Sequence, residues 1–167
     1  MTAAARFRAW RFLNPGLDPA GVPGGLGVAP TGGIAMVDED ESVRQAILLL
    51  LSTIPGERVM RPRYGSYLHR LVFAPNDQTT AGLAIHYVRQ AIERWEPRVE
   101  ILSIDANPHP EAPERLVVQL DYLVRASQLT GVLTYLLDLS GGRVEPAEAA
   151  DAAIAAAVVA PEEPVTS

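Results

Sequence analysis

The sequence contains neither cysteine nor lysine. Without cysteine, no disulfide framework and no thiolate metal site can hold the fold, and a catalytic cysteine is excluded as well. All 14 basic residues are therefore arginine, and 20 acidic residues outnumber them to give a net charge of −6. Because nucleic acids and anionic membranes attract basic surfaces, this charge argues against both as partners.

Long apolar runs are also missing. Neither Ala46 to Leu51 nor the Ala-rich run at 152–160 approaches the roughly 20 residues that a membrane-spanning helix needs, so we expect no membrane insertion. Near the start, Arg6, Arg8 and Arg11 are not followed by an apolar stretch of signal-peptide length, because residues 14–16 read Asn-Pro-Gly. We therefore expect assembly in the cytoplasm.

Motifs of enzymes and cofactor sites are equally scarce. The three histidines, His69, His86 and His109, lack the spacing of metal ligands. The glycine cluster at residues 21–27 lacks both the Lys-Ser/Thr ending and the preceding strand of a phosphate-binding loop. A Gly-x-Ser-x-Gly nucleophile motif does not occur. The sequence thus predicts no catalytic residue, no metal and no cofactor.

Composition divides the chain into three parts. Residues 14–33 are dense in glycine and proline, which predicts an irregular N-terminal arm over residues 1–36. Residues 143–167 hold nine alanines and five acids, and we expect this tail to be mobile or dependent on a partner. A weak Ala-rich helix is possible there over about 146–159. The predicted folded domain is residues 37–142.

Apolar spacing predicts three helices in that domain. The first follows Asp38 and carries an apolar stripe of Val43, Ile47, Leu50, Leu51 and Ile54. Leu48 and Leu49 extend the stripe around nearly the whole helix, so it must be covered on more than one side. A short helix is expected over residues 66–73. Asp77 can cap the third, which runs for about 18 residues until Pro97 stops it.

The period of the apolar residues changes to two after Pro97, which predicts strands over residues 99–106, 116–124 and 133–139. Short connections between them favour an antiparallel meander. The predicted fold class is therefore α+β, with the helices packed on one face of a three-stranded antiparallel sheet. The last strand of such a sheet is an edge that can pair with another chain.

Three motifs in a fixed order carry a family resemblance. Pro-Gly-Glu-Arg-Val-Met at 55–60 is followed by Pro-Arg-Tyr-Gly at 62–65 and, after about thirty more residues, by Glu-Pro-Arg at 96–98. Val-Arg-Gln-Ala-Ile at 43–47 precedes them, and Phe-Ala-Pro-Asn-Asp at 73–77 lies between. From about Ala9 to Leu139 the chain resembles the GPW-type baseplate wedge family of contractile phage tails. Relatives of that family occur in tailocins, extracellular injection particles and the TssE component of type VI secretion.

The resemblance implies a structural, non-enzymatic role inside the baseplate of a phage tail or phage tail-like particle. Its implied partners are the larger wedge proteins and the sheath protein, with tube or hub proteins as further candidates. Glu96, Pro97 and Arg98 would dock the wedge partner. The last strand would join the first sheath ring by strand exchange through Val132, Leu133, Thr134, Tyr135, Leu136, Leu137, Asp138 and Leu139.

The loop before the second helix supplies further candidate partner-binding residues, namely Glu57, Arg58 and Arg61. A glutamate at the C-terminal end of a helix opposes the helix dipole and needs a cation beside it. Arg98 is one candidate for that cation in Glu96-Pro97-Arg98. We also hypothesise that Arg58 or Arg61 pairs with Glu96.

Two other functions remain open. The founding phage member of the family was once described as a lysozyme, and Glu57 with Glu96 could be considered a glycosidase pair, although two acids among 20 are a weak signal. A single-domain anti-adaptor of the same fold is the other alternative. The sequence leaves open the kind of particle, the copy number and the roles of the two terminal segments.

Overall fold

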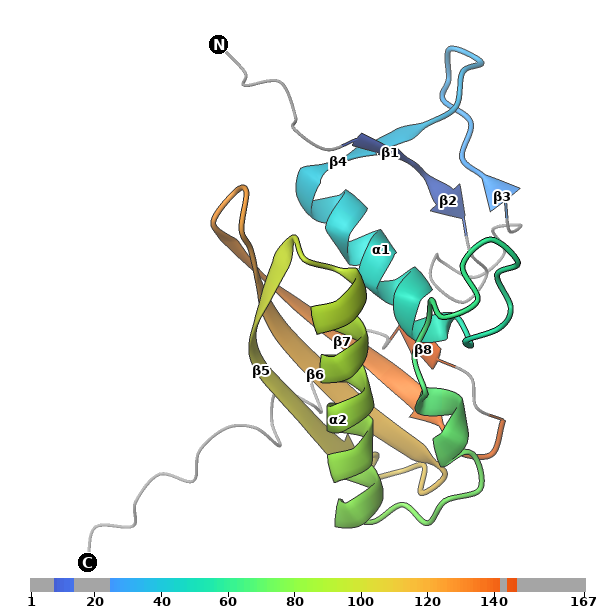
Figure 1. Cartoon of the computed structure of the whole chain (residues 1–167), viewed down its shortest axis with the longest axis vertical. Helices are drawn as coiled ribbons and strands as arrows, with labels where there is room; N and C mark the ends of the chain where they lie inside the picture. Colours follow the sequence, from blue (N-terminus) through green and yellow to red (C-terminus); the bar gives the residue numbers. More distant parts are fainter. Residues whose placement is uncertain (1–7, 14–24, 142–143, 147–167) are drawn as a thin grey trace, which may run out of the picture.

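The computed structural model describes residues 8–13, 25–141 and 144–146, and it has the predicted α+β architecture (Figure 1). In chain order the elements are β1 (Arg8–Trp10), β2 (Phe12–Leu13), β3 (Gly25–Leu26), β4 (Met36–Asp38), α1 (Glu39–Ser52), the 3₁₀ helix η1 (Leu68–Leu71), α2 (Gln78–Trp95), β5 (Val99–Pro108), β6 (Arg115–Val124), β7 (Leu129–Asp138) and β8 (Val144–Pro146). No helix within these residues is long and apolar enough to cross a membrane.

Helix α1 lies in the interior of the molecule, as its broad apolar stripe predicts. Its buried apolar residues are Val43, Ile47, Leu48, Leu50 and Leu51. The helix contacts α2, β7 and β8 on one side and the N-terminal strands β1 and β4 on the other. Ile54 lies beyond the last helical residue and is 38% exposed, so it does not belong to the buried stripe that the sequence predicts.

Helix α2 begins and ends where the sequence predicts. The Asp77 carboxylate accepts a hydrogen bond from the backbone N–H of Thr80 at 2.8 Å and caps the first turn. This contact also lowers the pKa of the Asp77 carboxyl, because it stabilises the charged form. The helix runs for 18 residues to Trp95, with Glu96 as its C-terminal cap and Pro97 immediately after.

The short helix predicted over residues 66–73 is a single 3₁₀ turn, η1, with Leu68 and Leu71 buried. Val72 is already extended, and Phe73 has a left-handed backbone with φ of 64°. A helix cannot continue through these two conformations. The Phe73 N–H instead donates to the carbonyl of Leu139 at 2.7 Å, which ties this turn to the end of the sheet.

The main sheet is an antiparallel meander in the order β5-β6-β7-β8 (Figure 1). The three predicted strands are confirmed, and the helices pack on one face of them. A fourth strand, β8, pairs with Tyr135–Leu137 of β7. It lies past residue 142, where the sequence placed the start of the tail, so β7 is not the last strand of the sheet.

Short paired strands interrupt the N-terminal arm that the sequence predicts to be irregular. β1 pairs with β4 and β2 pairs with β3, both antiparallel. Where the pairs meet, three backbone hydrogen bonds form a closed ring: Arg11 N–H to the Ala35 carbonyl (2.9 Å), Ala35 N–H to the Gly27 carbonyl (2.7 Å) and Gly27 N–H to the Arg11 carbonyl (2.7 Å). Residues 1–7 and 14–24 of the arm lie outside the described residues, as does nearly all of the predicted tail helix.

A single side chain of α1 fixes this N-terminal layer. The Gln45 amide donates to the carbonyl of Trp10 at 2.9 Å, and its oxygen accepts from the N–H of Phe12 at 3.0 Å. Both backbone groups belong to the break between β1 and β2, where the strand ladder cannot satisfy them. Gln45 itself is 9% exposed, so the N-terminal layer covers the outer side of α1.

Glycine at position 131 is required by the sheet packing. A Cβ added to Gly131 on β7 would lie 2.6 Å from the ring of Tyr122, the residue opposite it on β6. We expect Gly131→Ala to lower the free energy of unfolding by about 1–3 kcal/mol, because the ring must move within a packed site. Urea denaturation of the purified chain measures this change.

Gly82 on α2 is the matched control, because a Cβ added there has no heavy atom within 4 Å. We expect Gly82→Ala to raise the free energy of unfolding by up to about 1 kcal/mol through helix propensity. An unfolding midpoint of Gly131→Ala at or above that of the parent chain would contradict the packing argument.

Candidate partner-docking site

An ion pair between Glu96 and Arg98 forms the centre of the site. The Arg98 Nε donates to Glu96 Oε1 at 2.6 Å, and Nη2 donates to Oε2 at 2.7 Å. Such a two-bond fork is the strongest arrangement of arginine and carboxylate. Glu96 is only 7% exposed, whereas 28% of the Arg98 side chain remains exposed. The carboxylate is therefore satisfied within the chain, and part of the guanidinium faces solvent.

The position of this pair follows from the end of α2. The Glu96 N–H closes the last turn on the carbonyl of Ile92 at 2.8 Å, so its carboxylate lies at the negative end of the helix dipole. Arg98 supplies the compensating charge, and its Nη1 also contacts the Ser42 hydroxyl of α1 at 3.3 Å. Hydrogen bonding to Glu96 raises the pKa of the Arg98 guanidinium above its ordinary value.

Arg58 occupies a different position from the one hypothesised. Its guanidinium lies 4.3 Å from the centre of the Tyr64 ring, and the Tyr64 ring lies 5.4 Å from that of Trp95. Burial raises the pKa of the Tyr64 hydroxyl. Since Arg98 binds both oxygens of Glu96, and no ion pair among the described residues joins Arg58 or Arg61 to it, that hypothesis is wrong.

The structure nevertheless connects the loop to the Glu96–Arg98 pair. The stack of Arg58, Tyr64 and Trp95 runs from the loop to the residue directly before Glu96. Glu57 lies at the start of the loop, where its carboxylate accepts from the N–H of Ile54 at 2.9 Å. We call the set of Glu57, Arg58, Arg61, Glu96, Pro97 and Arg98 the docking surface. Four of its members are exposed: Glu57, Arg58, Arg61 and Pro97.

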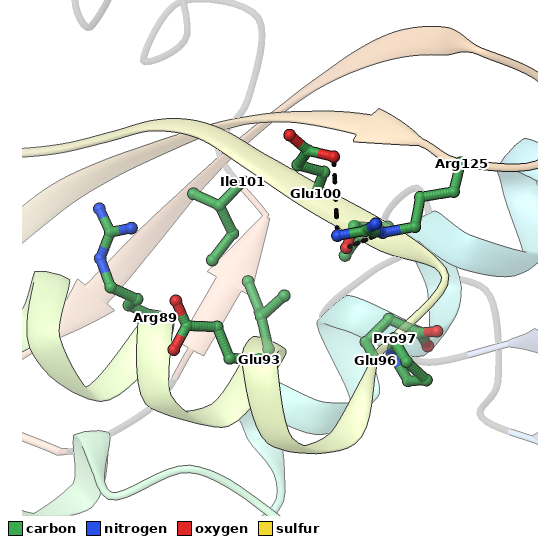
Figure 2. A pocket seen from close by; sticks show the side chains of 9 residues that line it. Arg89, Glu93, Glu96, Pro97, Glu100, Ile101 and Arg125 are labelled. Atoms are coloured by element: carbon green, nitrogen blue, oxygen red, sulfur yellow. Dashed lines mark hydrogen bonds and ion pairs between the residues drawn. The ribbon is translucent and has the colours of Figure 1, made fainter.

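A groove that the sequence did not reveal borders the docking surface. It has a volume of about 430 Å³ and lies between α2 and the start of β5 (Figure 2). Its walls are Arg89, Ile92, Glu93, Glu96, Pro97, Val99, Glu100, Ile101 and Arg125. Arg125 and Glu100 form an exposed ion pair of 3.6 Å at its rim. Three segments build the groove, namely the end of α2, the start of β5 and Arg125 after β6, so no single stretch of sequence carries a signal for it.

The predicted sheath-docking strand, Val132 to Leu139, is open along only part of its length. Leu139 donates its N–H to the carbonyl of Glu114 beside β6, and the unbroken register places every second residue of β7 in the same orientation. The outward N–H groups are therefore those of Thr130, Val132, Thr134 and Leu136. Leu136 lies opposite Glu145 of β8, so the open stretch within the described residues is 129–134.

Strand β8 ends at a residue that suits this pairing. Pro146 lies opposite Tyr135, whose backbone groups point toward β6. The missing N–H of a proline removes no ladder hydrogen bond at such a position. The strand is also only three residues long, so it covers the edge of β7 without extending along it.

The geometry gives little support for catalysis. Both oxygens of Glu96 accept hydrogen bonds from Arg98, and the residue is only 7% exposed, so neither oxygen faces a substrate. Glu57 is exposed and bound to a backbone N–H. Within the described residues, no group of three or more His, Asp or Glu side chains could hold a metal ion.

The described residues thus form a small α+β domain with an ion-paired corner, an exposed charged loop and a strand edge that is open over residues 129–134. The family model described as baseplate wedge protein gp25 matches residues 37–129 of the 167. The chain belongs to this family, and it is a structural baseplate component of the contractile, phage tail-like kind. Comparison with curated proteins gives no match.

Similar folds occur among solved structures. The chain is 39% identical to a candidate tail lysozyme from Geobacter sulfurreducens, with a TM-score of 0.57 over 63% of this chain and 96% of that one. It is 26% identical to a chain of the anti-feeding prophage baseplate, with a TM-score of 0.56 over 59% and 78% of the two chains. A chain of the postcontracted pyocin R2 baseplate is 25% identical, with a TM-score of 0.49 over 59% and 97%.

Removal of Arg98 leaves the Glu96 carboxylate buried without its cation. We expect Arg98→Ala to lower the free energy of unfolding by on the order of 3 kcal/mol. The Glu96 carboxylate would stay buried, and no nearby cation would offset the cost of its desolvation. Urea denaturation of the purified full chain at neutral pH measures the loss.

Arg125→Ala provides the control for this measurement. Its pair with Glu100 has both side chains more than half exposed, so we expect a loss of at most about 1 kcal/mol. Equal losses in the two variants would mean that the Glu96–Arg98 pair contributes no more than an ordinary surface pair.

Proposed function

We propose that this chain is a non-enzymatic connector of the baseplate, which joins the larger wedge proteins to the first sheath ring of a contractile particle. The observation that carries the proposal is the ion-paired corner of Glu96, Pro97 and Arg98, held rigid at the end of α2 and next to the exposed loop arginines. A surface already fixed in its binding geometry loses little conformational freedom on association.

The wedge partner binds the docking surface. Arg58 and Arg61 outnumber the one acid of the loop, Glu57, and give the loop side of the docking surface a positive charge within a chain of net charge −6. Such a local contrast favours a partner with carboxylates at matching positions and sets the orientation of docking. The groove between α2 and β5 extends the same surface and offers a recess beside Pro97.

The sheath joins through the open stretch of β7, residues 129–134. The outward N–H groups there can extend the sheet by one strand, with main-chain hydrogen bonds supplying the affinity. Leu129 and Val132 are 57% and 62% exposed, so apolar side chains are available beside the same edge. Because β8 covers the stretch opposite Tyr135–Leu137, the added strand ends next to Pro146, the last residue of β8.

A lysozyme activity is the second candidate, because one relative is named as a candidate tail lysozyme. The geometry of Glu96 opposes it, because Arg98 occupies both carboxylate oxygens and the residue is only 7% exposed. We expect purified chain to leave the turbidity of a peptidoglycan suspension unchanged over a period in which hen egg-white lysozyme clears it. Clearing that is lost in Glu96→Gln would contradict the connector function.

The strand edge is tested with a proline at Val132, whose N–H points outward. We expect Val132→Pro to enter baseplates while the fraction of particles with full-length sheath falls at least tenfold. The substitution removes one outward backbone N–H, and the pyrrolidine ring blocks the approach of a further strand. Electron microscopy of purified particles measures both quantities.

Val132→Thr is the matched control, because it changes the side chain and keeps the N–H; it should give sheaths at the parental level. The isolated proline variant should still unfold cooperatively in urea, which separates loss of the edge from loss of the fold. Normal sheaths on baseplates that carry Val132→Pro would mean that the sheath attaches elsewhere.

A further inference from the structure

The two most exposed large apolar side chains in the described residues are neighbours. Val59 is 91% exposed and Met60 is 93% exposed, and both lie in the loop that joins α1 to η1. Isolated exposed apolar residues are common on protein surfaces, but two adjacent ones at this level in a projecting loop are the pattern of an interaction site. The connector function proposed above does not assign them a role.

The base of this loop is tightly held. Ser66 donates its N–H to the Thr53 carbonyl at 3.0 Å and its hydroxyl to the Leu51 carbonyl at 2.9 Å. Gly65 has φ of +127°, and a Cβ added there would lie 2.3 Å from the Thr53 oxygen, so only glycine fits. The two ends of the loop are therefore locked together on the end of α1.

The tip is ordered by two successive turns. The Arg61 N–H donates to the Arg58 carbonyl at 3.1 Å, and the Tyr64 N–H donates to the Arg61 carbonyl at 3.0 Å. Val59 and Met60 are the two residues inside the first turn. Their exposure is thus a property of a fixed conformation, and binding through them requires little ordering of the backbone.

Charge around the tip is strongly one-sided. Arg58, Arg61 and Arg63 surround the two apolar residues and are exposed, while Glu57 is the only acid between Pro55 and Gly65. Among the described residues, no carboxylate forms an ion pair with Arg61 or Arg63. Arginine at the border of an apolar contact favours carboxylates on the opposing surface.

We propose that Val59 and Met60 are anchor residues that enter an apolar pocket on a protein partner, and that carboxylates at the rim of this pocket pair with Arg61 and Arg63. The inference rests on the proposed function for one point only, namely that the partner is another baseplate protein. The Arg58–Tyr64–Trp95 stack connects the loop to Glu96, so one partner can contact the tip and the Glu96–Arg98 corner together.

A different protein fits these observations better than a membrane, a nucleic acid or a second copy of this chain. A chain of net charge −6 is repelled from anionic lipid and nucleic acid. Two anchors on a rigid tip match a pocket, whereas membrane-binding elements present a long apolar face. A second copy of this chain would have to offer an apolar pocket lined by acids, and the described groove beside Pro97 is lined by two arginines as well as three glutamates.

Oxidation of Met60 by hydrogen peroxide reports directly on the contact. Mass spectrometry can follow it in the free full-length chain and in particles purified from producing cells. At 93% exposure, Met60 should oxidise rapidly in the free chain and at least tenfold more slowly in particles. An equal rate in both would overturn the inference. Absence of the parent chain from the particles would instead overturn the proposed function, so the two failures are distinguishable.

Variants give the second readout. Val59→Ser combined with Met60→Ser should fold normally and reduce the amount of chain in purified particles at least tenfold. Val28→Ser, at an exposed apolar position of the N-terminal layer, is the control and should leave that amount unchanged. Incorporation of the double variant at the parental level would overturn the anchor role.

The carboxylates proposed on the partner are tested by Arg61→Glu combined with Arg63→Glu. This double variant should reduce the amount of chain in purified particles at least tenfold. The corresponding pair of lysine substitutions should retain most of it, since the charge is kept. Parental incorporation of the glutamate pair would overturn the charged rim.

Two further measurements test whether the loop tip binds a membrane or a second copy of this chain instead. Co-sedimentation of the free chain with phosphatidylglycerol vesicles that is lost in the Val59/Met60 double variant would overturn the protein partner in favour of a membrane. A dimer in analytical ultracentrifugation that protects Met60 and is lost in the double variant would overturn it in favour of a second copy. We expect a monomer that remains unbound by the vesicles.

Discussion

The ion pair between Glu96 and Arg98 is the interaction on which the arrangement of the docking surface depends. A carboxylate that is almost completely buried at the negative end of α2 is tolerated because a guanidinium binds both of its oxygens. The same guanidinium contacts Ser42, so the pair also links the end of α2 to the first turn of α1. The chain then enters β5 directly, with the Val99 N–H bound to the Glu96 carbonyl at 3.3 Å.

Helix α1 connects the Glu96–Arg98 pair to the sheet, the N-terminal layer and the charged loop. One side packs against α2 and the sheet, while Gln45 holds the N-terminal layer on the other side through both partners of its amide. The end of α1 also carries the base of the charged loop, through the hydrogen bonds of Ser66 to Thr53 and Leu51. The loop, the corner and the N-terminal layer are thus all held against one buried helix.

Within the described residues, β8 covers only part of the outer edge of β7. β8 covers β7 opposite Tyr135–Leu137 and ends in a proline, so the fully covered part of the edge is short. The open part, residues 129–134, lies beside the turn between β6 and β7. An open edge is a liability in a free protein and an asset in an assembly that is completed by strand addition.

Local signals in the sequence determined the elements that depend on neighbouring residues. Asp77 and Pro97 fixed the two ends of α2, and the change of apolar period after Pro97 fixed the meander, because caps and side-chain periodicity act over a few residues. The motif order 55–65 and 96–98 was enough to indicate the family, which the match over 37–129 shows.

Only the tertiary structure decided which partners these residues find. Arg98, rather than Arg58 or Arg61, binds Glu96, because Arg58 is drawn to the Tyr64 ring by the stack on Trp95. Strands β1 and β4 pair across about 25 intervening residues. The glycines and prolines between them predict irregular structure, so the sequence gives no sign of the pairing. The groove beside Pro97 and the β8 cover of β7 likewise arise where separate segments meet. Composition and periodicity describe a segment alone, so contacts between distant segments lie outside what they specify.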